Sequence, residues 1–221
     1  MTDPSSAPEP APRGWWQGWG PRLTALIFVA TVAQLVLATL APDLPQFRGK
    51  AFGARPVAYP LLLLLVPVLW AALRRRGASG RDAARRDAAR RDAAPPWTGF
   101  ALIMSPFLVD VTGNTFDLYD SVGWWDDANH LVNWFLLCMG VGVLLLRSRA
   151  GPPWALGVAV AGIGALLAIG WELAEWFFFI RHSTEINTAY EDTLGDEGLG
   201  VVGGAIAALA VAGMRRRVRG P

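Results

Sequence analysis

The stretch WWDDANHLVNW, residues 124–134, opens a hydrophobic run that continues to Leu146. Its polar residues therefore stand at the mouth of a predicted membrane helix. On a helix, Asp126 and His130 are i,i+4 neighbours, and Asn133 lies three residues further along the same stripe. Polar groups at this depth are costly unless they are paired or functional. The stretch thus predicts either a polar site or hydrogen bonds between helices.

The whole chain has the composition of a polytopic membrane protein. Of its 221 residues, 53% are hydrophobic and 17% are charged. Several apolar runs approach the roughly 20 residues that cross a bilayer. We expect six membrane helices, at about residues 23–41, 57–73, 97–111, 128–146, 153–180 and 199–214. The predicted fold class is an all-α transmembrane helical bundle.

The sequence divides into three parts around this bundle. Residues 1–22 are rich in Pro, Ser and Ala and are expected to form a disordered cytoplasmic N-terminus. Residues 23–214 form a single transmembrane domain, and residues 215–221 form a basic cytoplasmic tail. An Arg-rich cytoplasmic loop at 74–96 contains an Arg-Asp-Ala-Ala repeat, expected to be a solvated linker or a topology anchor. The single cysteine, Cys138, excludes an internal disulfide and a cysteine-based zinc site.

The charges predict the orientation of the bundle. With a cytoplasmic N-terminus, 16 of the 20 basic and five of the 18 acidic residues face inward, so the inner side carries +11 and the outer side −9. This pattern follows the positive-inside rule and predicts that both termini are cytoplasmic. We expect a multi-pass protein of the bacterial inner membrane that contacts membrane lipids and no nucleic acid.

Four predicted helix ends bring carboxylates and one histidine to the outer face. At 1.5 Å per residue, Glu172 lies roughly 28 Å beyond Pro153 and so near the outer boundary. The candidate catalytic residues are His130, Asp126, Glu172 and Glu175. The candidate metal ligands are Asp192, Asp196 and His130. Further polar candidates at this level are Asp110, Asn114, Asp127 and Asn133.

These residue types suit three kinds of chemistry. Carboxylates with one imidazole could bind a divalent ion such as zinc, manganese or magnesium. A carboxylate such as Asp126 could instead orient His130 as a general base, while a protonated carboxyl donates a proton. The same groups could also form a proton or cation relay in a transporter. The sequence contains no G-x-S-x-G, H-E-x-x-H, Walker or dinucleotide-binding motif.

The order of three motifs resembles a known family. Asp126-x-x-x-His130 is followed by Trp171-Glu172-Leu173-Ala174-Glu175-Trp176 and by Asp192-Thr193-x-x-Asp196 before a Gly-rich helix. Over about residues 110–212 this order resembles the YjdF-like bacterial inner-membrane proteins, a family without a settled activity. It is distantly similar to VanZ-like proteins, which hints at the cell envelope or at glycopeptide tolerance. The second acid at Asp127 and the Arg-Asp-Ala-Ala loop depart from the pattern.

Three functional hypotheses follow from these observations. The first is an enzyme-like site at the outer membrane interface, acting on an amphiphilic or lipid-linked substrate that arrives laterally from the leaflet. The second is a small transporter that uses the acidic cluster as a coupling-ion site. A transporter should also place polar groups near the midplane, and we expect the first two helices to supply none. The third is a structural membrane protein whose polar residues only hold helices together.

Overall fold

The computed structural model describes residues 19–48, 50, 52–78, 94–147, 151–178, 180–182 and 184–219. Their regular structure is entirely helical. Six helices are long: α1 (Trp19–Leu40), α2 (Arg55–Ala78), α4 (Trp97–Thr115), α6 (Trp125–Leu146), α7 (Pro153–Phe178) and α8 (Ala189–Arg219). Short helices occupy the connections: η2 (Pro45–Phe47), α5 (Leu118–Ser121), η3 (Ile180–His182) and η4 (Thr184–Asn187). The N-terminal residues 1–18 and the predicted Arg-Asp-Ala-Ala repeat lie outside the described residues.

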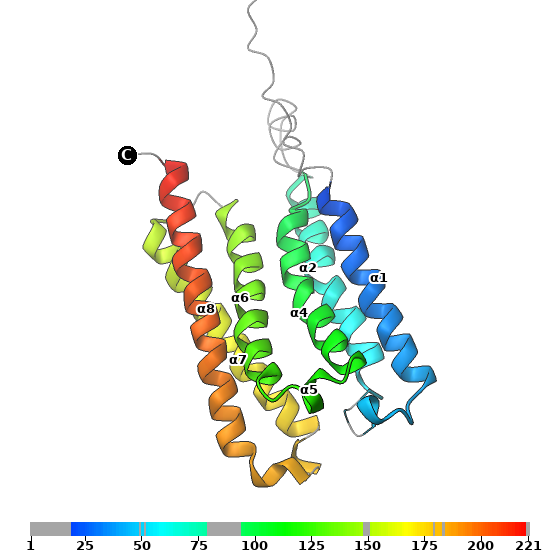
Figure 1. The fold of residues 1–221 in the computed structure, drawn as a ribbon. Helices are drawn as coiled ribbons and strands as arrows, with labels where there is room; N and C mark the ends of the chain where they lie inside the picture. The colour runs from blue at the N-terminus through cyan, green and yellow to red at the C-terminus, as the bar shows by residue number, and fades with distance from the viewer. Residues whose placement is uncertain are drawn as a thin grey trace, which may run out of the picture.

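Five of the long helices, α1, α2, α6, α7 and α8, have the length and apolar composition needed to cross a membrane. The sixth, α4, is 19 residues long and lies inside the bundle beside α1 and α6 (Figure 1). These helices confirm the predicted all-α polytopic membrane bundle. Pro60 and Pro67 lie within α2 without ending it. Prolines are tolerated in membrane helices because neighbouring groups satisfy the freed backbone carbonyls.

The bundle has two groups of helices joined at its centre. One group contains α1, α2 and α4, and the other contains α6, α7 and α8 (Figure 1). The contact between α4 and α6 joins them. Apolar side chains fill both groups: Leu63, Phe100 and Met104 belong to one cluster, while Val160 and Val211 belong to another. Tyr59 of α2 and Trp171 of α7 also meet across the two groups, with ring centroids 6.5 Å apart.

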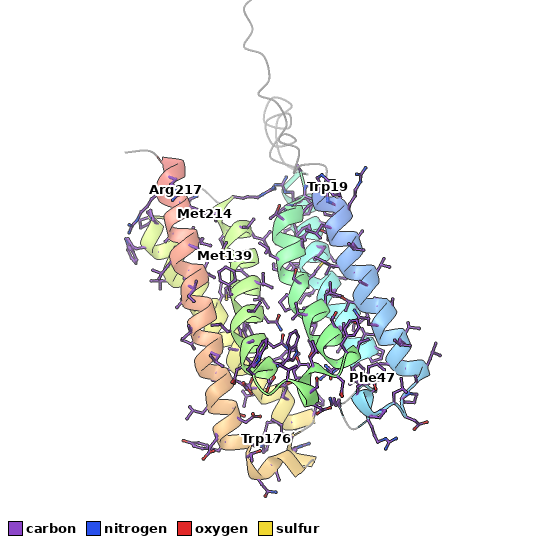
Figure 2. All side chains as sticks on the ribbon, viewed as in Figure 1. Trp19, Phe47, Met139, Trp176, Met214 and Arg217 are labelled. Carbon is purple, nitrogen blue, oxygen red and sulfur yellow. The ribbon has the colours of Figure 1, made fainter. Side chains whose placement is uncertain are left out.

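Successive long helices run in opposite directions. Figure 2 shows Trp19, at the start of α1, and Arg217, near the end of α8, at one end of the bundle, which we call the basic end. Phe47 and Trp176 lie at the opposite end, which we call the acidic end. The described chain thus begins and finishes on the same side, because its six long helices alternate in direction. At the basic end the buried Arg215 donates a hydrogen bond of 3.0 Å to the carbonyl of Leu146.

At the acidic end, three helices extend beyond the boundaries that hydropathy predicts. Helix α4 continues to Thr115, α6 already begins at Trp125, and α8 begins at Ala189 and not near residue 199. Acidic residues in the first turns of α6 and α8 interact favourably with the positive end of the helix dipole. Polar residues expected to lie in loops or at helix mouths are therefore held in rigid helices.

Helices α6 and α8 approach each other closely because α8 presents glycines to α6. A Cβ atom on Gly203 would lie 2.3 Å from the carbonyl oxygen of Leu131, and one on Gly200 would lie 2.8 Å from the Trp134 ring. Small residues allow this approach between membrane helices. The close packing brings the first turns of α8 beside the first turns of α6, where His130 lies.

Candidate functional site

His130 lies at the middle of a cluster that we call the His130 centre, formed with Asp126, Glu172, Glu175 and Asp196. Its Nδ1 atom lies 3.5 Å from Asp196 Oδ1 and 3.8 Å from Glu172 Oε1. Its Nε2 atom, on the other side of the ring, lies 3.7 Å from Asp126 Oδ1. Atoms of His130, Glu172 and Glu175 also lie within 4.8 Å of one another. The structure thus brings together five residues that the sequence marked as candidates.

Three helices supply these side chains at matching depths. His130 follows the start of α6 by five residues, Asp196 follows the start of α8 by seven, and Glu172 precedes the end of α7 by six. At 1.5 Å per residue each lies roughly 8–11 Å inside the bundle from its helix end. The i,i+4 spacing places Asp126 one turn before His130 on α6. The centre is therefore built on regular helices near the acidic end.

The polar atoms of the His130 centre lack the hydrogen bonds that buried polar groups normally make. The Nδ1 atom of His130 is buried and has no hydrogen-bond partner among the described residues. The side chains of Glu172 and Asp196 are only 6% and 8% exposed. In the described part of the chain no residue donates a hydrogen bond to either carboxylate, and His130 is their only ion-pair partner. Carboxylates this close cannot all stay ionised without a cation or a shared proton.

Asp110 lies in a second cluster, the Asp110 centre, whose hydrogen bonds are complete. Arg55 Nη1 donates to Asp110 Oδ2 at 3.0 Å, and the hydroxyl of Tyr59 donates to the same oxygen at 2.6 Å. The hydroxyl of Tyr119 donates to Asp110 Oδ1 at 3.0 Å. The side-chain amide of Asn114 donates to the backbone carbonyl of Asp110 at 3.0 Å. This centre ties α2 and α5 to α4.

Two asparagines on α6 connect the Asp110 centre to the helix that carries His130. Asn129 Nδ2 donates a hydrogen bond to the hydroxyl oxygen of Tyr119, and Asn133 Nδ2 donates to Asn129 Oδ1 at 2.6 Å. Burial, followed by the charge of Asp110, holds the pKa of Tyr119 well above its usual range. The Tyr119 hydroxyl therefore stays protonated and can donate to Asp110 while it accepts from Asn129.

Other predicted residues lie outside the His130 centre. Asp192 and Asp127 are exposed, and neither belongs to the groups of residues close enough to hold a metal ion together. Asn114 belongs to the Asp110 centre, and Asn133 lies on the asparagine link. The roles predicted for these residues stay predictions.

Sequence reasoning missed several participants in the polar network. The expectation that the first two helices supply no polar groups is wrong, because Arg55 and Tyr59 of α2 bind Asp110 and Gln34 of α1 binds Thr112. Arg55 and Tyr59 begin a segment that is otherwise mostly apolar, so hydropathy assigned them to its edge. The signal that could have found Arg55 is a basic residue at the outer mouth of a helix, where the positive-inside rule disfavours it.

A hollow of about 450 Å³ opens beside Glu172 between α7 and α8. Its lining residues are Ile169, Glu172, Leu173, Trp176, Thr193 and Glu197. The side chains of Ile169, Leu173 and Trp176 are exposed on the membrane-spanning surface of α7. The hollow therefore leads from the apolar outer surface of the bundle to a residue of the His130 centre.

A cluster of this kind can do two things chemically. The ligand types of zinc or manganese are present, since one imidazole lies close to two carboxylates in the group His130, Glu172 and Glu175 and in the group Asp126, His130 and Asp196. Without a metal ion, an imidazole held between carboxylates can take up and return a proton, as a general base and acid does. Both functions use the Nδ1 side of His130, and in both Asp126 faces the opposite ring nitrogen.

Comparison with known proteins identifies the family of the chain. The sequence model of the family described as "Predicted membrane protein (DUF2238)" matches residues 23–217, which include all six long helices except the first few residues of α1 and the last two of α8. No curated protein and no solved structure matches the chain. The matched range includes the His130 centre, the Asp110 centre and the hollow beside Glu172. The chain belongs to the DUF2238 family of predicted membrane proteins.

Proposed function

We propose that the His130 centre is the active site of a membrane-embedded enzyme that acts on an amphiphilic or lipid-linked substrate of the cell envelope. The observation that carries this proposal is the position of Glu172. Its carboxylate lies 3.8 Å from His130 Nδ1, and the same residue lines the hollow between α7 and α8. A molecule lying in the hollow would therefore place its polar part against the reactive groups.

The walls of the hollow favour a substrate that is partly hydrocarbon. Ile169, Leu173 and Trp176 are apolar and open to the membrane side, while Glu172, Glu197 and Thr193 offer polar groups. An acyl or polyisoprenyl chain can pack along the apolar side chains through van der Waals contacts, as it does against other lipid tails in the bilayer. A polar head group would then lie near Glu172. This arrangement supports lateral arrival from the bilayer.

His130 is the proposed proton carrier of the reaction. Asp126 would accept the N–H of Nε2 and so hold the ring with Nδ1 toward Glu172 and Asp196. Nδ1 could then remove a proton from the substrate or from water, and a protonated carboxyl could supply one to the leaving group. Asp126 is a positioning residue in this scheme, whereas His130 and Glu172 would touch the reacting atoms.

The distribution of buried polar groups favours an enzyme over a transporter. Among the described residues, the buried polar side chains away from the acidic end include Thr24 and Arg215 toward the basic end and Thr31 near the middle of α1. Each donates a hydrogen bond to a backbone carbonyl, so each is occupied by the fold itself. A transporter requires groups that can serve an ion or substrate near the midplane and beyond it. The polar clusters here are concentrated at one end.

The proposal places the acidic end on the outer face of the bacterial inner membrane. Described basic residues at the other end include Arg22, Arg74, Arg147 and Arg217. The positive-inside rule would put that end in the cytoplasm. The distant resemblance to VanZ-like proteins agrees with an envelope substrate at the opposite face.

A crosslinking experiment tests this function. A photoreactive amino acid replaces Leu173 in the hollow, and in the matched control it replaces Leu209, an exposed residue of α8 outside the hollow. We expect Leu173 to capture an amphiphile that Leu209 does not capture, and the captured amount should rise when His130→Ala prevents turnover. Identical lipid adducts at both positions, unaffected by His130→Ala, would contradict the proposal.

A further inference from the structure

We propose that His130 Nδ1, Glu172 and Asp196 bind one divalent transition-metal ion of the zinc type, and that Asp126 positions His130 for it. The inference deepens the proposed function, on whose active site it rests, by naming the cofactor of that site. With an ion bound to Nδ1, the proton would be carried by a neighbouring carboxylate such as Glu175 and no longer by His130. The inference starts from a mismatch in the His130 centre. Two carboxylates, Glu172 and Asp196, face the same nitrogen of His130 there, and no donor among the described residues satisfies them.

The distances fit a single ion. Metal–ligand bonds of about 2.0–2.1 Å in a tetrahedral zinc site separate the ligand atoms by roughly 3.3–3.4 Å. The Nδ1 atom of His130 lies 3.5 Å from Asp196 Oδ1 and 3.8 Å from Glu172 Oε1. A contraction of a few tenths of an ångström would bring each carboxylate oxygen to coordination distance from Nδ1. Glu172 and Asp196 do not form a group with His130 in which all ligand atoms lie within 4.8 Å, so the two carboxylates would also have to turn toward each other to share one ion.

Burial gives the second and independent observation. Glu172 and Asp196 are more than nine-tenths buried, and both point at a histidine nitrogen that is itself buried and has no hydrogen-bond partner among the described residues. Buried carboxylates normally accept hydrogen bonds or coordinate metals. An exposed acidic cluster would be solvated and would need no ion. These side chains have little solvent and no donor among the described residues to stabilise their charge.

The opposite nitrogen of the ring completes the pattern. Asp126 Oδ1 lies 3.7 Å from Nε2, so a carboxylate faces the nitrogen that does not face Glu172 and Asp196. Histidines that bind metals usually donate their other N–H to a carboxylate or carbonyl, which fixes the tautomer. Here Asp126 would hold the proton on Nε2 and leave the Nδ1 lone pair for the ion.

The ligand set selects the class of ion and leaves a position for substrate. One nitrogen and two oxygens suit zinc or manganese, whereas calcium and magnesium prefer oxygen ligands alone. Three protein ligands with an open fourth position are typical of catalytic zinc sites. Glu172 also lines the hollow between α7 and α8, so the open position would be reachable from there. Glu175 lies within 4.8 Å of the same His130 and Glu172 and supplies a neighbouring carboxylate.

The test is metal binding by the purified full-length protein in detergent. The chelator-treated protein is titrated with zinc, and cobalt is used in parallel because its visible absorption reports the coordination of the bound ion. We expect one ion per chain, with a cobalt spectrum of low coordination number. Asp196→Asn and Glu172→Gln, which keep side-chain size, should lower zinc affinity by about 100-fold or more. Asp126→Asn should lower it by roughly 10–100-fold, as expected for an orienting residue.

The neighbouring exposed acid Asp127 gives the matched control. Asp127→Asn removes the same charge one residue from Asp126 and should leave both affinity and stoichiometry unchanged. Failure of the wild type to bind one equivalent, or equal binding by wild type and His130→Ala, would overturn the metal site. Thermal unfolding with and without zinc adds a second readout, since only variants that bind should gain stability.

The results separate the metal site from the proposed enzyme. If zinc does not bind but Leu173 still captures an amphiphile in a His130-dependent way, the metal inference fails and the enzyme stands on proton transfer. If zinc binds and no amphiphile is captured, the metal site stands and the proposed substrate fails. Binding that Asp127→Asn and Asp196→Asn weaken equally would indicate loose association with surface acids, and would also overturn the inference.

Discussion

The two polar centres lie at the same end of the bundle but differ in whether their carboxylates accept hydrogen bonds. In the Asp110 centre, both oxygens of Asp110 accept hydrogen bonds, from Arg55, Tyr59 and Tyr119. In the His130 centre, Glu172 and Asp196 accept no hydrogen bond from the described residues and face a histidine nitrogen without a partner. A satisfied buried network stabilises and specifies a fold, while unsatisfied groups cost free energy unless a ligand or proton occupies them. We therefore propose a structural role for Asp110 and a functional role for His130.

The largest loss of stability should come from disrupting the Asp110 centre. Asp110→Ala removes the partner of the partly buried Arg55 and leaves two tyrosine hydroxyls unpaired. Removing one partner of a buried ion pair costs about 3–5 kcal/mol. Equilibrium unfolding in mixed detergent micelles measures this loss. Asp127→Ala, at an exposed acid, should stay within about 0.5 kcal/mol of wild type. Equal stabilities for the two variants would show that Asp110 is not structural.

The next effect concerns the packing that assembles the His130 centre. Gly203→Ala would push a Cβ atom to 2.3 Å from the backbone carbonyl of Leu131 and so separate α8 from α6. A backbone carbonyl cannot move aside without displacing its whole helix, and overpacking of this kind destabilises a protein by about 1–3 kcal/mol. Because Asp196 is on α8 and His130 on α6, we also expect loss of metal binding.

Gly213 provides the control for that packing on the same helix. A Cβ atom there meets nothing within 4 Å, so Gly213→Ala should be neutral or slightly stabilising through helix propensity. Gly204 is intermediate, since its Cβ would contact only Cys138 Sγ at 3.4 Å. Thermal unfolding of the three alanine variants checks the order. A Gly203→Ala protein as stable as Gly213→Ala would contradict the close contact between α6 and α8.

Sequence reasoning reached the His130 centre because its evidence is local and periodic. The i,i+4 spacing of Asp126 and His130 and the position of Glu172 along α7 follow from helix geometry alone. The Asp110 centre is different, since Arg55 and Asp110 are 55 residues apart and meet only through the packing of α2 against α4. Hydropathy also predicted three helices that are too short at the acidic end. It assigns polar residues to loops even where helix dipoles and packing hold them in a helix. The hollow beside Glu172 depends on the separation of α7 and α8, which no periodicity reports.

A substitution in the His130 centre should change the free energy of unfolding in the opposite direction to Asp110→Ala. Glu172→Gln removes one of several buried carboxylates that lack a donor, while keeping the side-chain size. In the presence of a chelator we expect stability to rise or stay unchanged, by an amount on the order of 1 kcal/mol. The same variant should lose metal binding and the proposed turnover. A loss of about 3 kcal/mol in chelator would mean that Glu172 is a structural residue like Asp110.

The smallest effect tests an exposed ion pair beside the satisfied centre. Lys50 Nζ donates to Asp120 Oδ2 at 2.5 Å and ties the connection after η2 to α5, the helix that carries Tyr119. This hydrogen bond from Lys50 lowers the pKa of Asp120 below its ordinary value. A carboxyl with a lowered pKa in the folded state stabilises the fold above the ordinary pKa of about 3.9, and this contribution disappears as pH falls through the lowered pKa.

Because the Asp120 side chain is 58% exposed, solvent screening should limit the contribution of this pair to less than about 1 kcal/mol. Lys50→Gln should therefore be slightly less stable than wild type at neutral pH. The difference between the two proteins should shrink in high salt, which screens exposed charges, and vanish in acid. Asp120→Asn should show the same small loss at neutral pH, since it removes the other partner. Unfolding of all three proteins across this pH range measures the difference in unfolding free energy between each variant and wild type. The titration of the other carboxylates contributes equally to all three proteins and drops out of this difference. A gap between wild type and Lys50→Gln that persists after Asp120 is protonated would show that Lys50 acts through packing and not through its charge.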